Sequence, residues 1–161
     1  MATVYFDKQF APLVDIFCKS KNETTKKQIF DKNYDFMIFA ALIGQHYYDS
    51  CKDVNVEHGP NEIPDRIFYS NSKENVTYLL ALHSEKSGDI LKDKNDRDCW
   101  NYLERYASLG CEEIAKWISE KQDINMDIND VILNKIKEVA AENTENDSNS
   151  DEESEEDDID F

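Results

Sequence analysis

Residues Tyr34–Tyr47 read YDFMIFAALIGQHY, and this stretch decides the fold. Its middle, FMIFAALI (Phe36–Ile43), is apolar on every side of a helix. A helix that is apolar all round is buried in a protein core, and eight apolar residues are too few to cross a bilayer. The stretch therefore predicts a central buried helix from about Asn33 to Tyr48, against which the rest of the chain packs.

Five further segments carry apolar residues at the three- and four-residue spacing of a helix that buries one face. The residues expected on the buried faces are Phe10, Leu13, Val14 and Phe17; Val76, Leu79, Leu80 and His83; Trp100, Leu103 and Ala107; Ile114, Trp117 and Ile118; and Ile128, Val131, Ile132, Ile136 and Val139. Gly110 is expected to end one helix before the next begins, and Asp127 is expected to cap the last. The segments TVYF (Thr3–Phe6) and RIFYS (Arg66–Ser70) are predicted as short strands.

Length and charge divide the chain into a body and a tail. The 161 residues predict one domain, and the chain carries 35 acidic against 18 basic residues. Eleven of the acidic residues, and no Lys or Arg, fall in residues 141–161, where like charges repel and little is apolar enough to bury. The prediction is a mainly α, compact helical domain of about six helices with one or two short strands over residues 1–141. A disordered acidic C-terminal tail is predicted over residues 142–161.

The charge argues against direct DNA binding through the acidic surface. A net charge of −17 opposes the phosphate backbone of nucleic acids. Lys19, Lys21, Lys26 and Lys27 form the best basic patch, for which a solvated loop is the simpler explanation.

The cysteines and the N-terminus indicate a cytoplasmic protein. The start MATVYFDKQF lacks the basic and apolar regions of a signal peptide. The cysteines form no C-x-x-C pair and are expected as small buried hydrophobic residues with reduced thiols. They are Cys18, Cys51, Cys99 and Cys111.

The common signatures of catalysis are absent from the sequence. Its four glycines are scattered, which excludes a P-loop and a dinucleotide-binding fingerprint. It contains no H-E-x-x-H and no G-x-S-x-G motif. No Lys follows an acidic residue at the two-residue spacing of the common nuclease core. We therefore expect no enzyme, no metal and no cofactor.

The histidines keep one catalytic alternative open. His46 lies near Asp49 and could act as a base, although a helix end packed by tyrosines explains its position as well. His83 falls on an apolar stripe and is expected in the core. A hydrolase that uses His46 with Asp49 therefore stays as a minor alternative.

The chain ends in DDIDF, which places two large apolar side chains beside the terminal carboxylate. Such an ending can insert into a pocket with a basic rim. It resembles the acidic tip of bacterial single-stranded-DNA-binding proteins, but Asp160 stands where that tip usually has Pro. The alternatives are a tail that imitates a phosphate backbone and one that only keeps the protein soluble. The candidate partner-binding residues are Asp157, Asp158, Ile159, Asp160 and Phe161.

Four stretches carry a resemblance to a known family. They are YDFMIFAALIGQHY (Tyr34–Tyr47), EIPDRIFYS (Glu62–Ser70), NVTYLLALHSEKSGDIL (Asn75–Leu91) and NYLERYASLGCEEIAKWI (Asn101–Ile118). Through them the chain resembles the small bacterial family Dnd system-associated protein 4, over about Tyr5–Lys121. The last helix and the tail are expected to fall outside the resemblance.

The family pattern points to five residues of this chain. A buried helix ends in a turn at a glycine, here Gly44, and a later helix reads Glu-x-Tyr-Ala-x-x-Gly, here Glu104, Tyr106, Ala107 and Gly110. The resemblance implies no catalytic residues, so these five are expected to be structural. Tyr106 and Gly110 are expected to set the packing between two helices.

The resemblance implies a genomic setting, namely the loci that replace an oxygen of the DNA backbone with sulfur and the restriction genes linked to them. We expect a non-enzymatic accessory or regulatory protein of such a phage-defence system, which binds a protein partner through its body or its tail. The alternative is a DNA-facing regulator or a DNA mimic, because TVYF (Thr3–Phe6) followed by helices faintly resembles a ribbon-helix-helix protein. Whether the chain forms a homo-oligomer is left open.

Overall fold

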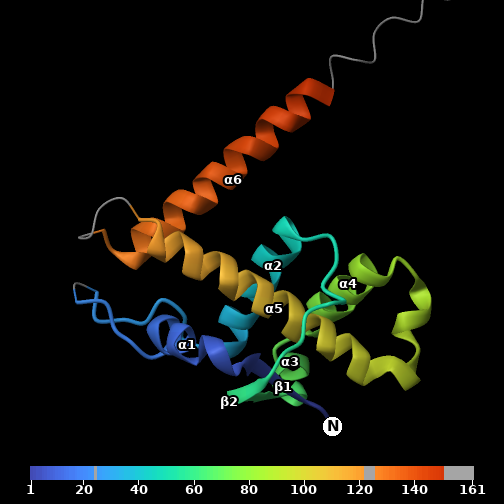
Figure 1. Cartoon of the computed structure of the whole chain (residues 1–161). Helices are drawn as coiled ribbons and strands as arrows, with labels where there is room; N and C mark the ends of the chain where they lie inside the picture. The colour runs from blue at the N-terminus through green and yellow to red at the C-terminus, as the bar shows by residue number, and fades with distance from the viewer. Residues whose placement is uncertain (24, 122–125, 151–161) are drawn as a thin grey trace, which may run out of the picture. The chain divides into compact units, whose positions relative to one another are not determined.

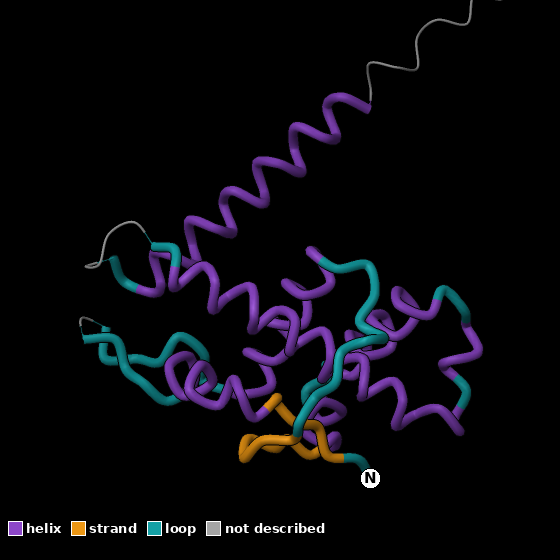
Figure 2. Tube along the Cα trace, in the orientation of Figure 1, coloured by secondary structure: helices purple, strands orange, loops and turns teal. Residues whose placement is uncertain are grey.

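The computed structural model of the chain describes residues 1–23, 25–121 and 126–150. The backbone divides into two compact units, Met1–Lys116 and Trp117–Phe161. The single-domain boundary at residue 141 stays a prediction, and each unit is described here by itself. The elements, which are drawn in Figure 1 and coloured by type in Figure 2, are β1 (Thr3–Asp7), η1 (Lys8–Phe10), α1 (Ala11–Cys18), α2 (Asn33–Tyr47), β2 (His58–Pro64), α3 (Asp65–Ser70), α4 (Glu74–Glu85), η2 (Gly88–Leu91), η3 (Asp93–Asn95), α5 (Asp96–Ser119) and α6 (Ile128–Ser150).

The predicted fold class is confirmed: the described residues form six α-helices and one two-stranded sheet. Helix α6 runs through residues 142–150 of the predicted tail, while the boundary between body and tail stays a prediction. These nine residues read ENTENDSNS, and Asn, Thr, Asp and Ser have low helix propensity, so composition alone did not indicate the extension. The remaining part of the predicted tail, residues 151–161, lies outside the described residues.

Two local predictions were wrong. The segment Arg66–Ser70 belongs to helix α3, not to a strand. The second strand is instead His58–Pro64, whose Gly and Pro residues hide it in the sequence. It forms because β1 lies antiparallel to it, with Val4 opposite Ile63, and both of these side chains are buried.

Gly110 does not end a helix. Helix α5 runs without interruption from Asp96 to Ser119 and passes through Gly110. A Cβ atom at Gly110 would overlap the carbonyl oxygen of Ala40 on α2, and one at Gly44 would overlap that of Tyr106 on α5. The two glycines therefore let the backbones of α2 and α5 touch, as small residues do wherever helices approach closely.

Aromatic side chains fill the core beside this crossing. Phe36 of α2 stacks on Phe17 of α1, with ring centroids 4.8 Å apart, and lies 5.7 Å from the ring of Phe6 on β1. All three are buried. The inner face of α2 is therefore buried, as the prediction of a central helix requires, and it packs against both α1 and β1.

The four cysteines are buried and unbridged, as expected of small hydrophobic residues. Burial raises the pKa of the Cys18 and Cys51 thiols to about 11 and raises that of Cys111 further. The thiols are therefore protonated at neutral pH and are poor nucleophiles.

The second unit contains the end of α5 and helix α6. Asp127 caps α6 as predicted, since its Oδ1 accepts a hydrogen bond of 2.9 Å from the backbone N–H of Asn129. Val131 and Ile132 are buried, whereas Ile136, which was expected on the same stripe, is 42% exposed. The apolar stripe of α6 therefore continues beyond its buried part.

Candidate functional site

The family residues lie on two helices of the first unit. Gly44 belongs to α2, and Glu104, Tyr106, Ala107 and Gly110 follow one another along α5. Tyr106 and Ala107 are buried at the crossing, and the Tyr106 hydroxyl donates to the backbone carbonyl of Asp49 over 3.2 Å. This hydrogen bond ties the chain that leaves α2 back to α5.

Glu104 has a different place, against the sheet. Its side chain is only 3% exposed. Its Oε1 accepts a hydrogen bond of 2.9 Å from the backbone N–H of Tyr5 and one of 3.1 Å from Arg97. Its Oε2 lies 3.4 Å from Nε2 of His58, whose ring stacks on that of Tyr5 at a centroid distance of 4.0 Å. A buried carboxylate needs such partners, because an unpaired one is strongly destabilising.

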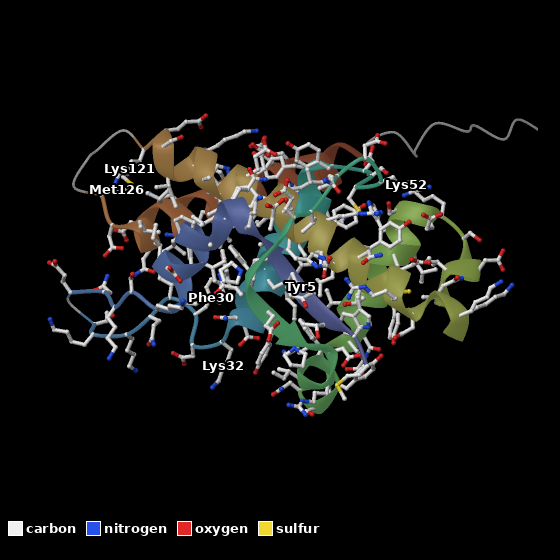
Figure 3. The ribbon with its side chains drawn as sticks, turned by 60° about the horizontal axis from the view of Figure 1, so that its bottom comes forward. Tyr5, Phe30, Lys32, Lys52, Lys121 and Met126 are labelled. Atoms are coloured by element: carbon white, nitrogen blue, oxygen red, sulfur yellow. The ribbon has the colours of Figure 1, made fainter. Side chains whose placement is uncertain are left out.

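Glu104 and Arg97 together cover the edge of β1 that does not pair with β2. Arg97 donates to the carbonyl of Thr3 over 2.6 Å, while Glu104 accepts from the N–H of Tyr5, which lies on β1 (Figure 3). The opposite edge of β1 pairs with β2. Strand edges left open are templates for pairing with another chain. Because both edges are in use, β1 does not have the free edge that pairing with the strand of a second chain requires.

Sequence reasoning singled out Glu104 but missed its partners Arg97 and His58. Arg97 lies seven residues before Glu104, two turns earlier on the same face of α5, which is a signal the sequence did contain. His58 lies on the strand that was not predicted. Both carboxylate oxygens contact protein groups, so the cluster is suited to holding the sheet on α5.

The two members of the hydrolase alternative take separate roles. Asp49 contributes its backbone carbonyl to Tyr106. The ring of His46 is exposed and packs edge-on against the ring of Tyr47 at 4.8 Å. The structure does not assemble these side chains into an acid–base pair among the described contacts.

Two contacts join side chains of α2 to the later segment that contains α4. The hydroxyl of Tyr34, in the first turn of α2, donates to Oδ1 of Asn71, at the end of α3, over 3.3 Å. Near the other end of α2, Nε2 of Gln45 lies 3.5 Å from Nε2 of His83, which belongs to α4.

Leu42 of α2 and Leu79 of α4 are both exposed, by 48% and 65%. Each lies one helical turn before a member of the Gln45–His83 pair, on the same side of its own helix as that member. We call Leu42, Leu79, Gln45 and His83 the α2–α4 surface.

The prediction that Leu79 is a core residue was wrong. The buried residues of α4 are Thr77, Leu80, Ala81 and Ser84. The true inward face is rotated by about one residue from the predicted stripe, so that small and polar side chains are buried along with Leu80. The large apolar residue is left outside, where it is available for binding.

The lysines of the basic patch lie on one exposed segment between α1 and α2. Lys21, Lys26 and Lys27 are exposed, and Lys19 forms an ion pair with Asp15 over 2.7 Å. Lys32, at the end of the segment, is also exposed (Figure 3). This arrangement agrees with the solvated loop that the sequence favoured.

The second unit holds an open hollow of about 360 Å³. Lys121 and Met126, labelled in Figure 3, line it together with Trp117 and Val131 of the flanking helices. Two glutamates and two lysines share its rim, so the rim favours neither an anion nor a cation.

Three remaining expectations concern the tail, metals and membranes. Asp157–Phe161 lies outside the described residues. Over the described part of the chain, no three metal-binding side chains gather in one place. None of the described helices has the length and apolar character needed to cross a bilayer.

Comparison with known proteins gives one match. The model of the family described as DNA sulphur modification system-associated protein 4 matches residues 6–152. The match extends beyond the expected end at Lys121 and includes α6, so the expectation that the last helix lies outside the family was wrong. The comparison with curated proteins and that with solved structures gave no match.

Proposed function

The chain belongs to the family of DNA sulphur modification system-associated protein 4, and on that premise we propose that it is a non-enzymatic accessory protein. In this proposal it binds another protein of the modification system through the α2–α4 surface. Its association with a DNA sulphur modification system follows from the family. The binding role rests on the properties of the surface itself.

The exposure of Leu42 and Leu79 is the observation that carries the proposal. Single exposed leucines are common on proteins, but each of these two lies one helical turn before a member of the Gln45–His83 contact, and they are 48% and 65% exposed. Exposed apolar side chains with polar groups beside them are a frequent feature of protein-binding sites. Removing one leucine from water contributes about 1.5–3 kcal/mol.

The polar pair within the surface supports a specific partner. Gln45 and His83 meet at 3.5 Å, the longest distance at which a hydrogen bond forms. A partner that offers a donor or an acceptor here can replace this weak contact with a better one. A partner without such a group would leave the pair buried and poorly paired, which costs free energy.

The chemistry of the buried groups supports a role without catalysis. Both oxygens of Glu104 are engaged by protein groups, and the cysteine thiols have raised pKa values. Neither Glu104 nor a cysteine lines the hollows beside Trp117, Tyr102 or Tyr34 in the described part of the chain. Glu104 and the buried cysteines are instead suited to stabilising the packing of the helices that carry the α2–α4 surface.

The acidic ending Asp157–Phe161 is proposed as a second contact with the same partner or another one. Ile159 and Phe161 would enter a pocket, and the acids before them would meet its basic rim. This contact is separable from the first, because it uses residues at the far end of the chain.

The proposal is tested by capture from cells that carry the sulphur modification genes. The baits are the full chain, the Leu42→Glu and Leu79→Glu variants, and Leu91→Glu as a matched control, since Leu91 is 43% exposed on η2. The lysate is treated with nuclease, and bound proteins are identified by mass. We expect a protein encoded by the modification genes to be retained by the full chain and the control and lost from the other two. Retention by all four baits would contradict the proposal.

A further inference from the structure

Helix α4 buries one leucine together with small and polar side chains and leaves its other large apolar residues outside. Its buried residues are Thr77, Leu80, Ala81 and Ser84. Leu79 is 65% exposed, and Val76 and Leu82, one turn to either side of it, are partly exposed. A helix of a globular protein normally turns its large apolar residues towards the core. The observed packing of α4 therefore buries less apolar surface than its sequence allows.

Three buried polar atoms on α4 have no hydrogen-bond partner in the described part of the chain. They are Oε2 of Glu74, Oγ1 of Thr77 and Oγ of Ser84. The Ser84 hydroxyl lies near the Cys51 thiol and the Tyr106 hydroxyl, but it does not reach either with the geometry of a hydrogen bond. Spacings of three and seven residues place the three groups on one side of the helix. Burying polar atoms without partners costs free energy, which weakens the hold of the core on this side of α4.

A rotation of α4 about its own axis by one residue, about 100°, exchanges this buried face for a more apolar one. The positions of Glu74, Thr77, Leu80, Ala81 and Ser84 then pass to Lys73, Val76, Leu79, Leu80 and His83. The first exchange lies at the partly exposed start of the helix, and the next two keep the size of the side chain and remove a buried hydroxyl. The last two need more room in the core. The polar atoms therefore favour the rotation, and the larger side chains oppose it.

The backbone at both ends of α4 is suited to absorbing such a rotation. Ser72 precedes the helix with a φ of 54°, and Lys86 follows it with a φ of 57°. Both lie in the left-handed region, which favours glycine and strains other residues. Motions of a whole element are commonly absorbed by changes of φ and ψ at the few residues that end it.

We propose that α4 has two arrangements and rotates between the observed one and one in which Val76 and Leu79 are buried. Leu79 is available to a partner in the observed arrangement and withdrawn in the rotated one. The rotation therefore controls access to the α2–α4 surface, and a partner that contacts Leu79 selects the observed arrangement. This consequence for binding rests on the proposed function, whereas the rotation itself does not.

The experiment is thiol labelling of the purified full chain that carries Thr77→Cys. Thr77 is fully buried in the observed arrangement and reaches solvent when α4 rotates. The native cysteines give a low background, because they are buried and the pKa of the Cys111 thiol is raised by burial. Labelled positions are identified by mass. We expect position 77 to react at least about tenfold faster than Cys111 in the same molecules, since Cys111 becomes accessible only when the chain unfolds. Equal rates at the two positions would overturn the proposal.

A second substitution separates rotation from local unfolding of α4. Leu79→Ala, added to Thr77→Cys, removes the side chain whose burial stabilises the rotated arrangement, so labelling at position 77 should slow at least about tenfold. Local unfolding would not slow in this way, because Leu79 is already exposed in the folded helix. Leu91→Ala is the matched control, since Leu91 is 43% exposed on η2, and it should leave the rate within about twofold.

A labelling rate at position 77 that Leu79→Ala does not slow would overturn the proposal, even if position 77 reacts faster than Cys111. Circular dichroism checks that each variant keeps its helical content. The labelling requires no partner, so its outcome is independent of the capture experiment that tests the proposed function.

Discussion

Gly110 of α5 lies so close to Ala40 of α2 that a Cβ atom on Gly110 would overlap the carbonyl oxygen of Ala40. The reciprocal contact, of Gly44 with the backbone of Tyr106, makes the crossing a backbone-to-backbone contact on both sides. This crossing fixes α2, and α2 in turn carries half of the proposed binding surface. Gly44 and Gly110 therefore support the helix that carries half of the α2–α4 surface, although they are not part of that surface.

Gly110→Ala should destabilise the protein by about 3 kcal/mol, because the new methyl group forces two helices apart in a close-packed core. Gly88→Ala is the matched control, since a Cβ at Gly88 meets no atom within 4 Å, and it should change stability by less than about 1 kcal/mol. Urea unfolding followed by circular dichroism measures both. If Gly110→Ala and the wild type unfold at the same urea concentration, the backbones of α2 and α5 are not in close contact at Gly110.

Glu104→Ala should cost about 3 kcal/mol, because it leaves Arg97 and the N–H of Tyr5 without their buried acceptor. Glu57→Ala removes an exposed ion pair with Lys8 and should cost at most about 1 kcal/mol. Amide exchange adds a local readout, since the N–H of Tyr5 should exchange faster in Glu104→Ala. If the two variants unfold at the same urea concentration, Glu104 does not hold the sheet.

Stability should fall in alkaline solution as the buried thiols are forced to ionise. An unfolded cysteine titrates near pH 8.5, whereas burial raises the pKa of Cys51 to about 11. Between these values the unfolded chain has lost the proton that the folded chain keeps, so the free energy of unfolding decreases as the pH rises.

Comparing the wild type with Cys51→Ala separates the contribution of the Cys51 thiol to the free energy of unfolding from the contributions of the other groups that titrate at high pH. The stability advantage of the wild type over Cys51→Ala should shrink by roughly 1.4 kcal/mol per pH unit across this window. Urea unfolding at several pH values gives the difference. An advantage that stays constant up to pH 11 would contradict the raised pKa of Cys51.

Removal of Asp157–Phe161 should leave the fold intact and weaken partner capture. The deletion removes no residue of the described helices, so the unfolding midpoint should change little. A matched control keeps the length and replaces only Ile159 and Phe161 by Ser, which separates the apolar contact from the acidic charge. Unchanged capture by both variants would leave the tail as a solubilising segment.

The sequence predicted the parts of the fold in which a single hydrophobic pattern indicates one kind of element and no second pattern competes with it. The apolar run Phe36–Ile43 favoured a buried helix, and α2 formed there, although Leu42 within the run is 48% exposed and not buried as the pattern predicted. Gly110 was misjudged because a glycine at a helix end and a glycine at a helix crossing look alike in a single sequence. Strand β2 was missed because its pairing with β1, and not its own composition, stabilises it.

The candidate surface was harder to predict than the fold. Leu79 and Leu80 are the same residue type, and the sequence placed both on the buried stripe, whereas Leu80 is buried with Thr77 and Ala81 and Leu79 is exposed. Arg97 lies two turns before Glu104 on α5, but the other two partners of Glu104, Tyr5 and His58, come from distant parts of the chain. Such contacts depend on tertiary structure, which local spacing does not encode.

The most direct test of the proposed function is the affinity of the purified chain for its captured partner, measured by titration calorimetry for the wild type, Leu79→Glu and Leu91→Glu. We expect Leu79→Glu to raise the dissociation constant at least about tenfold, because a charge would enter the apolar centre of the interface. Leu91→Glu should stay within about twofold of the wild type. Equal affinities for all three proteins would place the binding site elsewhere and contradict the role assigned to the α2–α4 surface.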